Sequence, residues 1–135
     1  MAGPEPKEIV LASLSRCAGK EGFISSFYLR FMAASPDIPP YFRKTDFEKQ
    51  NKMLLRSLML SVGAMNGDSV SLKELGERAK SHDREHLNVH PTLYPFWLDA
   101  LAQTVRQYDD KWTPLIDEAW RKTFQHVIDY MSRRY

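Results

Sequence analysis

The chain has 135 residues, of which 43% are hydrophobic and 27% are charged, and its formal net charge is +2. This length fits one globular domain over residues 1–135, and so small a charge argues against nucleic acid as the main partner. A single cysteine, Cys17, excludes an internal disulfide; with no leader pattern and no long apolar stretch, a cytoplasmic protein without membrane contact is expected.

Two helices and a proline-rich corner are expected in the first 42 residues. Residues 1–7 are expected to be flexible, and the helical spacing of apolar residues predicts a first helix over 7–18. A second helix is expected over 24–34, with four bulky side chains, Phe27, Tyr28, Phe31 and Met32. The three prolines that follow impose a short irregular corner, which Phe42 closes.

The next two helices are predicted from Thr/Ser-x-x-Glu patterns, which are typical of capping boxes. Thr45 with Glu48 predicts a helix of about 20 residues that ends near residues 65–68. Ser71 with Glu74 predicts a second helix. Its inner face is expected to contain Leu72, Leu75, Ala79 and His82.

The last third of the chain continues the helical pattern. Apolar and aromatic residues form a helical stripe over 92–108, and Thr113 followed by Pro114 predicts the start of a final helix. No alternating pattern typical of a β-strand competes anywhere. The sequence therefore predicts a single all-α domain of about six to seven helices.

Three of the four histidines follow one another at intervals of four residues: His82, His86 and His90. Two histidines at i and i+4 share a helix face and can bind zinc, but the metalloprotease pattern requires glutamate directly after the first histidine. That place holds Asp83, and no cysteine pair lies nearby. Zinc is disfavoured, and His86 and His90 fit a solvated helix end.

His82 fits a solvated helix end poorly, because it continues the expected inner face of its helix. A core-facing histidine in an all-α domain with a proline-built corner indicates haem. One neutral imidazole can hold haem iron, and the ring buries a large apolar surface.

Four stretches of the chain resemble the globin family, most of all bacterial single-domain globins and the haem domain of flavohaemoglobins. They are "FYLRFMAASPDIPPYF", "TDFEKQNKMLLRSL", "ERAKSH" and "HPTLYPFWLDAL". The resemblance covers residues 8–131. It implies a globin fold that encloses haem b, with a five-coordinate iron open to oxygen, nitric oxide or carbon monoxide.

The resemblance implies a role for six residues of this chain. His82 matches the proximal ligand of the iron, and Tyr94 matches an aromatic residue that lies near it. Phe42 matches the phenylalanine that wedges against the haem ring.

On the distal side, where gas binds, Tyr28 lies fourteen residues before Phe42 and matches the distal tyrosine of flavohaemoglobins. Gln50 matches the distal position that is glutamine in many bacterial globins. Leu54 matches the apolar residue that presses on the ligand.

Two features depart from the flavohaemoglobin pattern. The segment from His82 to Tyr94 is about two residues longer, which leaves His86 as a weaker proximal candidate. The place of a supporting glutamate falls at about Tyr135, which disfavours strong electron donation to the iron and peroxidase activity. The acceptor for the second imidazole nitrogen of His82 is either a backbone carbonyl or Tyr94.

Three functions of different classes are consistent with these residues. The leading hypothesis is a haem protein that binds oxygen and other diatomic gases for storage, transport or sensing. The alternative is a nitric oxide dioxygenase, which needs an external reductase because no reductase domain follows in this sequence. The third is a haem-free globin-fold interaction module. Sensing requires a signalling partner, since no output domain is attached.

Overall fold

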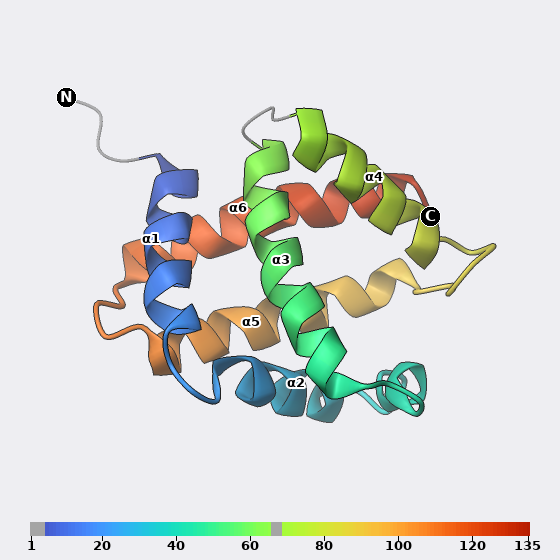
Figure 1. Cartoon of the computed structure of the whole chain (residues 1–135), viewed down its shortest axis with the longest axis horizontal. Coiled ribbons are helices and arrows are strands. Elements are labelled where there is room, and N and C mark those ends of the chain that lie inside the picture. Colours follow the sequence, from blue (N-terminus) through green and yellow to red (C-terminus); the bar gives the residue numbers. More distant parts are fainter. Residues whose placement is uncertain (1–4, 66–68) are drawn as a thin grey trace.

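The structure is a computed structural model that describes residues 5–65 and 69–135. Within these residues every regular element is helical (Figure 1). The six α-helices are α1 (Pro6–Ala18), α2 (Phe23–Ala34), α3 (Phe47–Met65), α4 (Ser69–His82), α5 (Tyr94–Tyr108) and α6 (Pro114–Arg133). Two short 3₁₀ helices, η1 (Pro39–Phe42) and η2 (Pro91–Leu93), precede α3 and α5.

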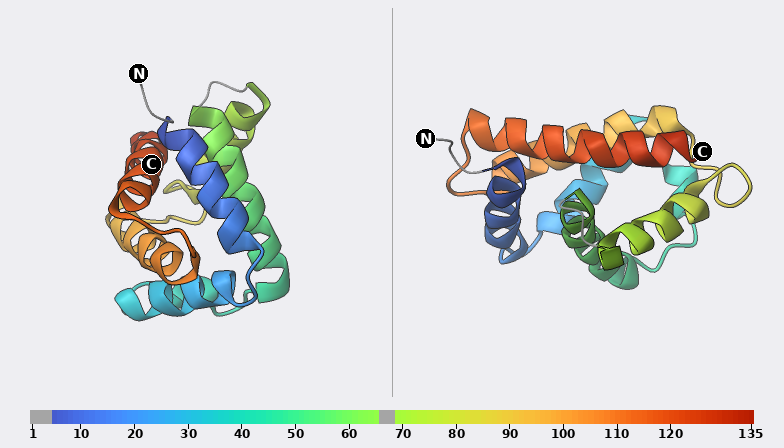
Figure 2. Two further views of the ribbon diagram at one scale, coloured as in Figure 1. Left: turned by 90° about the vertical axis from the view of Figure 1, so that its left-hand side faces the viewer. Right: turned by 90° about the horizontal axis from the view of Figure 1, so that it is seen from above.

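The helices pack in three main pairs, two of which join helices that are distant in sequence. α1 packs against α6, α2 against α5, and α3 against α4, while α3 also crosses α6. Figure 2 shows α6 on one side of the molecule and α3 with α4 on the other. None of the described helices is long and apolar enough to cross a membrane.

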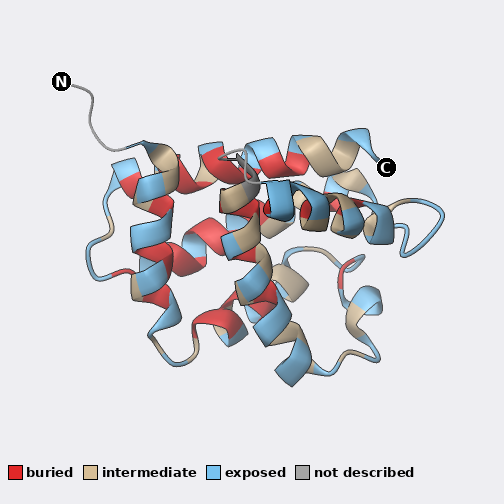
Figure 3. Cartoon of the chain, turned by 45° about the horizontal axis from the view of Figure 1, so that its top comes forward, coloured by how far each residue is buried: buried red, intermediate tan, exposed pale blue. Residues whose placement is uncertain are grey.

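The apolar core fills one end of the molecule. Nearly all of the fully buried large side chains come from α1, the first half of α2, the second halves of α3 and α5, and the first half of α6. Trp120 and Phe124 stack at its centre, with their ring centroids 5.5 Å apart. Figure 3 shows these buried residues on the inward faces of the helices. The opposite halves of α2, α3, α5 and α6 are thereby left to line a separate space.

Two of the predicted helix starts were placed wrongly. Asp46, not Thr45, caps α3, because its Oδ1 accepts the backbone N–H groups of Glu48 at 3.1 Å and Lys49 at 3.4 Å. α4 begins at Ser69, so Ser71 lies inside its first turn and is buried. By contrast, Thr113 caps α6 as predicted, accepting from the N–H of Ile116 at 3.4 Å.

The expected limits of two early helices are only partly described. Residues 1–4 of the expected flexible N-terminus lie outside the described residues, whereas Pro6 and Lys7 belong to α1. α3 is helical as far as Met65, and the other residues of its expected end, 66–68, lie outside the described part. On α4, Leu75 and Ala79 are buried as expected, but Leu72 is 38% exposed, so it is wrong to place Leu72 on the inner face.

A buried carboxylate joins α1 to the connection between α5 and α6. The Asp109 side chain is fully buried; it accepts a hydrogen bond from Ser13 at 2.6 Å and two from the Arg16 guanidinium at 2.6 and 2.9 Å. The indole N–H of Trp120 donates to the same Ser13 hydroxyl at 2.9 Å. Burial alone raises the pKa of Asp109, but the hydrogen bonds from Arg16 and Ser13 outweigh it and hold the pKa at about 2.

We predict that Asp109→Asn lowers the free energy of unfolding by about 2–4 kcal/mol, because it leaves Arg16 without its anionic partner. Urea denaturation followed by circular dichroism measures this. The matched control is Asp110→Asn, because the neighbouring Asp110 side chain is exposed and pairs with Lys20 at the surface. Equal effects of the two substitutions would contradict the assignment.

The stabilisation by Asp109 should also depend on pH. Since the folded pKa of Asp109 lies below the unfolded value of about 3.9, the stabilisation is fully present above that value. The stability difference between the wild type and Asp109→Asn should therefore shrink as the pH falls from about 5 towards 2. A difference that stays constant over this range would rule out an ionised Asp109.

Candidate functional site

A cavity occupies the end of the molecule opposite the core. It contains about 1020 Å³ of empty space, part of which is open to solvent. The lining comes from α2, η1, the first half of α3, the ends of α4 and α6, and the start of α5. All six residues that the sequence singled out line it: Tyr28, Phe42, Gln50, Leu54, His82 and Tyr94.

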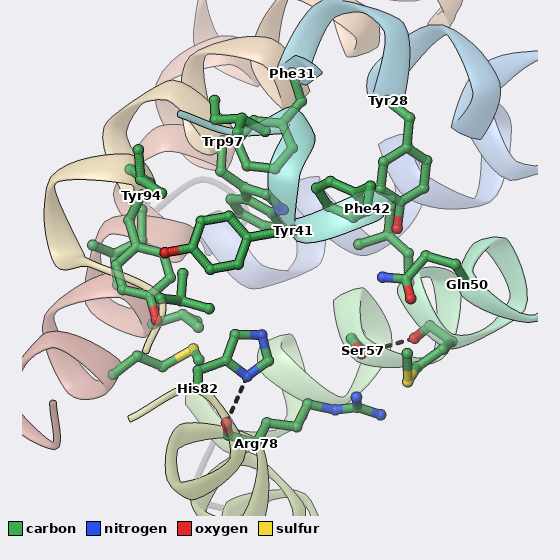
Figure 4. A pocket seen from close by; sticks show the side chains of 18 residues that line it. Tyr28, Phe31, Tyr41, Phe42, Gln50, Ser57, Arg78, His82, Tyr94 and Trp97 are labelled. Carbon is green, nitrogen blue, oxygen red and sulfur yellow. Dashed lines mark hydrogen bonds between the residues drawn. The ribbon is translucent and has the colours of Figure 1, made fainter. Parts of the chain in front are cut away.

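His82, the last residue of α4, presents its imidazole to the cavity (Figure 4). Its Nδ1 lies 2.8 Å from the backbone carbonyl oxygen of Arg78, one turn earlier. Since a carbonyl only accepts, Nδ1 carries the proton and Nε2 keeps its lone pair. Nε2 has no hydrogen-bond partner among the described residues and faces the cavity.

Burial favours the neutral form of this imidazole. It lowers the pKa of His82 from its ordinary value, and the charge of Arg78 acts in the same direction, against the effect of the backbone hydrogen bond. The His82 side chain is therefore a neutral base whose free nitrogen points into an apolar space, which is the form of histidine that ligates metals.

Tyr28 and Gln50 lie on the wall opposite His82, and their polar ends point towards one another (Figure 4). Tyr28 is buried, which raises the pKa of its phenol, while a hydrogen-bond interaction with Gln50 partly offsets the rise. The hydroxyl of Tyr28 therefore stays protonated at neutral pH and can donate a hydrogen bond.

Aromatic rings hold Tyr28 in place. Its ring makes edge contacts with Phe42, at a centroid distance of 5.7 Å, and with Phe47, at 5.5 Å. Phe42 and Phe47 in turn stack 6.0 Å apart. Because Phe42 belongs to η1 and Phe47 starts α3, the proline-rich corner fixes the position of the phenol.

Leu54 and Tyr94 complete the predicted set on different walls. Leu54 is 7% exposed and lies one turn after Gln50 on α3, so it presents an apolar surface beside the two donors. Tyr94 is the first residue of α5. Its pKa is raised to about 12, mainly because the phenol is buried. Of the two acceptors considered for the imidazole of His82, the structure has the backbone carbonyl of Arg78 and not Tyr94.

The other histidines face away from the cavity. His86 is exposed and pairs with Asp83 at 2.7 Å, and His90 caps η2 by accepting from the N–H of Thr92. His126 is exposed on α6. Within residues 5–65 and 69–135, no three histidine, cysteine or acidic side chains gather where they could hold a metal ion.

Sequence reasoning missed the contacts that hold the loop after His82. Asn88 adopts a left-handed conformation, with φ of 51°, and its carbonyl accepts from the hydroxyl of Tyr41 at 2.7 Å. Its side-chain oxygen accepts from the hydroxyl of Tyr135, and the Tyr135 carbonyl accepts from the N–H of Arg84 at 3.3 Å. The loop is thus held between η1 and the end of the chain; a lone asparagine after a helix was the only signal for it in the sequence.

The arrangement suits a flat apolar group that contains a metal. A single imidazole nitrogen faces it from one side, two neutral donors face it from the other, and apolar side chains cover its faces. An imidazole alone is too few ligands for a bare zinc ion, but it is sufficient for an iron whose other in-plane ligands belong to a macrocycle.

Comparisons with known proteins agree with this geometry. A model of the globin family matches residues 25–131 of the chain. Among solved structures, the chain is similar to PA3967 of Pseudomonas aeruginosa, which is described as structurally highly homologous to a human haemoglobin. The two are 33% identical with a TM-score of 0.92, over 97% of this chain and 98% of that one. No curated protein sequence matches the chain.

Proposed function

This chain belongs to the globin family, and we propose that it is a haem protein that reversibly binds oxygen and other diatomic gases through a Tyr28/Gln50 distal pair. The observation that carries the proposal is the unpartnered Nε2 of His82, which faces these two donors across an apolar cavity. A haem-free interaction module gives no reason for this arrangement, because the desolvation of an imidazole without a ligand is unfavourable.

The residues present fit haem b. The cavity offers a neutral imidazole together with aromatic and aliphatic walls. The other common type, haem c, is attached through cysteines in a Cys-x-x-Cys-His pattern. The chain has only Cys17, which is fully buried in the core on α1 and does not line the cavity. Non-covalent binding through His82 is therefore what the donor set supports.

On the proximal side, the chain contributes orientation. The Arg78 carbonyl accepts the Nδ1 proton of His82, which fixes both the tautomer and the direction of Nε2. Haem, held by His82, would supply an iron that can bind a diatomic gas. A neutral carbonyl acceptor pulls less strongly on the imidazole proton than a carboxylate does. That fits gas binding better than peroxidase chemistry.

On the distal side, the chain contributes hydrogen bonds in a dry space. The Tyr28 phenol is the stronger donor, and Gln50 can either donate or orient it. A donor in a low-dielectric pocket stabilises a ligand that carries partial negative charge, as dioxygen does here, more than it stabilises carbon monoxide. Leu54 and Phe42 keep water away from the same face.

The first prediction concerns His82. His82→Ala should abolish stable haem binding, because no other described histidine faces the cavity. Haem content is measured from the Soret absorbance of the purified protein. His86→Ala and His90→Ala are matched controls and should retain haem. Loss of haem in His86→Ala with retention in His82→Ala would show that His86 is the ligand.

The second prediction concerns Tyr28. Tyr28→Phe should speed oxygen dissociation by roughly tenfold or more, because a hydrogen bond to a charged acceptor contributes about 1.5–3 kcal/mol. Gln50→Ala should have a smaller effect in the same direction. Stopped-flow measurement gives the rates.

The control for that measurement is Tyr108→Phe, which removes a phenol that pairs with Ser26 at 2.7 Å outside the cavity. It should leave oxygen dissociation unchanged. If Tyr28→Phe behaves like this control, the phenol does not bond to the ligand.

A further inference from the structure

Arg78 is the only permanently charged residue among those that line the cavity in the described part of the chain. It lies one turn before His82 on α4, and its side chain extends along the cavity towards Ser57 on α3 (Figure 4). The rest of the lining is mostly apolar. A guanidinium at this place needs an explanation, since transfer of a cation from water to an apolar wall is unfavourable unless an anion pairs with it.

The side chain of Arg78 has no partner of its own in the described structure. Its Nε is buried and makes no hydrogen bond. The expected partner on a helix is an acid one turn away, and Glu74 occupies that place. Glu74 instead accepts from Arg56 of α3, at 3.1 Å. The Nε of Arg78 is therefore a buried donor that is left unsatisfied within the described residues.

We propose that Arg78 binds a carboxylate of the cofactor, a haem propionate, at the edge of the cavity. The inference rests on the proposed function, since it needs haem in the cavity. Guanidinium presents a planar set of donors that matches a carboxylate, and pairing is strongest where water is scarce. The ligand class that satisfies both the apolar walls and the buried Nε is a large flat apolar molecule with an acidic edge.

This assignment gives Arg78 two separate roles. Its backbone carbonyl orients the His82 imidazole, and its side chain fixes the rotation of the cofactor about the bond to that imidazole. A substitution of the side chain leaves the carbonyl in place. The two roles can therefore be separated by mutation.

The test is a cycle of two proteins and two cofactors. Wild type and Arg78→Leu are each loaded with ferric protohaem or with its dimethyl ester, in which both carboxylates are neutralised. The rate of cofactor loss to an excess of a haem-binding acceptor protein is then measured by absorbance. Two further variants are measured. Arg78→Lys keeps the charge but not the planar donors, and Lys80→Leu removes an exposed cation of α4 that does not line the cavity.

We expect Arg78→Leu to release protohaem roughly tenfold to a hundredfold faster than wild type, which is the range for loss of a charge-assisted hydrogen bond. With the dimethyl ester this difference should disappear, because the interaction requires both partners. The rate at which Arg78→Lys releases protohaem should lie between the rates of the wild type and Arg78→Leu. Lys80→Leu should match wild type with either cofactor. All holoproteins should keep the same visible spectrum, because His82 is unchanged.

Equal acceleration with both cofactors would overturn the proposal and make Arg78 a packing residue, and so would no acceleration with either. If Arg78→Leu does not fold, the wild type alone still decides. It should release the ester faster than protohaem by a factor similar to that expected for the mutation, and equal rates would contradict the proposal. A wild type that takes up neither cofactor would instead refute the proposed function itself.

Discussion

The hydrogen bond from Nδ1 of His82 to the carbonyl of Arg78 is the constraint on which the site depends. It fixes the tautomer, so the free lone pair belongs to Nε2, and it fixes the ring plane, so Nε2 faces the cavity. The acceptor is a backbone carbonyl of the same helix, one turn before the histidine, so no second side chain is needed to orient the ring. Burial supports the same neutral form by lowering the pKa of His82. The donors of Tyr28 and Gln50 are useful only because they face this nitrogen across the cavity.

The core and the cavity lie next to one another along the same helices. α3, α5 and α6 contribute mainly one half to the core and the other to the cavity, while residues such as Leu54 and Val127 belong to both. The core end is secured by the buried Asp109, which ties α1 to the start of α6 through Ser13 and Trp120. At the cavity end, Tyr41 and Tyr135 hold Asn88 and so the loop that follows His82.

Helical periodicity was enough to predict the all-α architecture, because periodicity is local and needs no knowledge of tertiary contacts. The six residues that line one cavity were named from the resemblance to globins, and not from periodicity or spacing alone. The helix starts were less predictable, because Asp46 and Thr45 are adjacent and both are good caps. The exposure of Leu72 was missed for a related reason. Leu72 lies in the first turn of its helix, and a single turn does not define which face of a helix is buried.

Arg78 shows why the rest could not be predicted. An arginine one turn after a glutamate is typical of a solvated helix face, and only the pairing of Glu74 with Arg56 reveals that Arg78 is free. Asn88 accepts hydrogen bonds from Tyr41 and Tyr135, each of which is 47 positions away in the sequence. Local sequence patterns carry no signal at such a separation. Long-range polar contacts of this kind depend on the finished packing.

We propose that the cavity between His82 and the Tyr28/Gln50 pair binds one haem, and a spectrophotometric titration of the purified chain with haem is the direct test. We expect a Soret band, distinct from that of free haem, that saturates at one haem per chain. After reduction, the spectrum should be that of a five-coordinate iron that takes up carbon monoxide. A spectrum that remains that of free haem throughout the titration would contradict it.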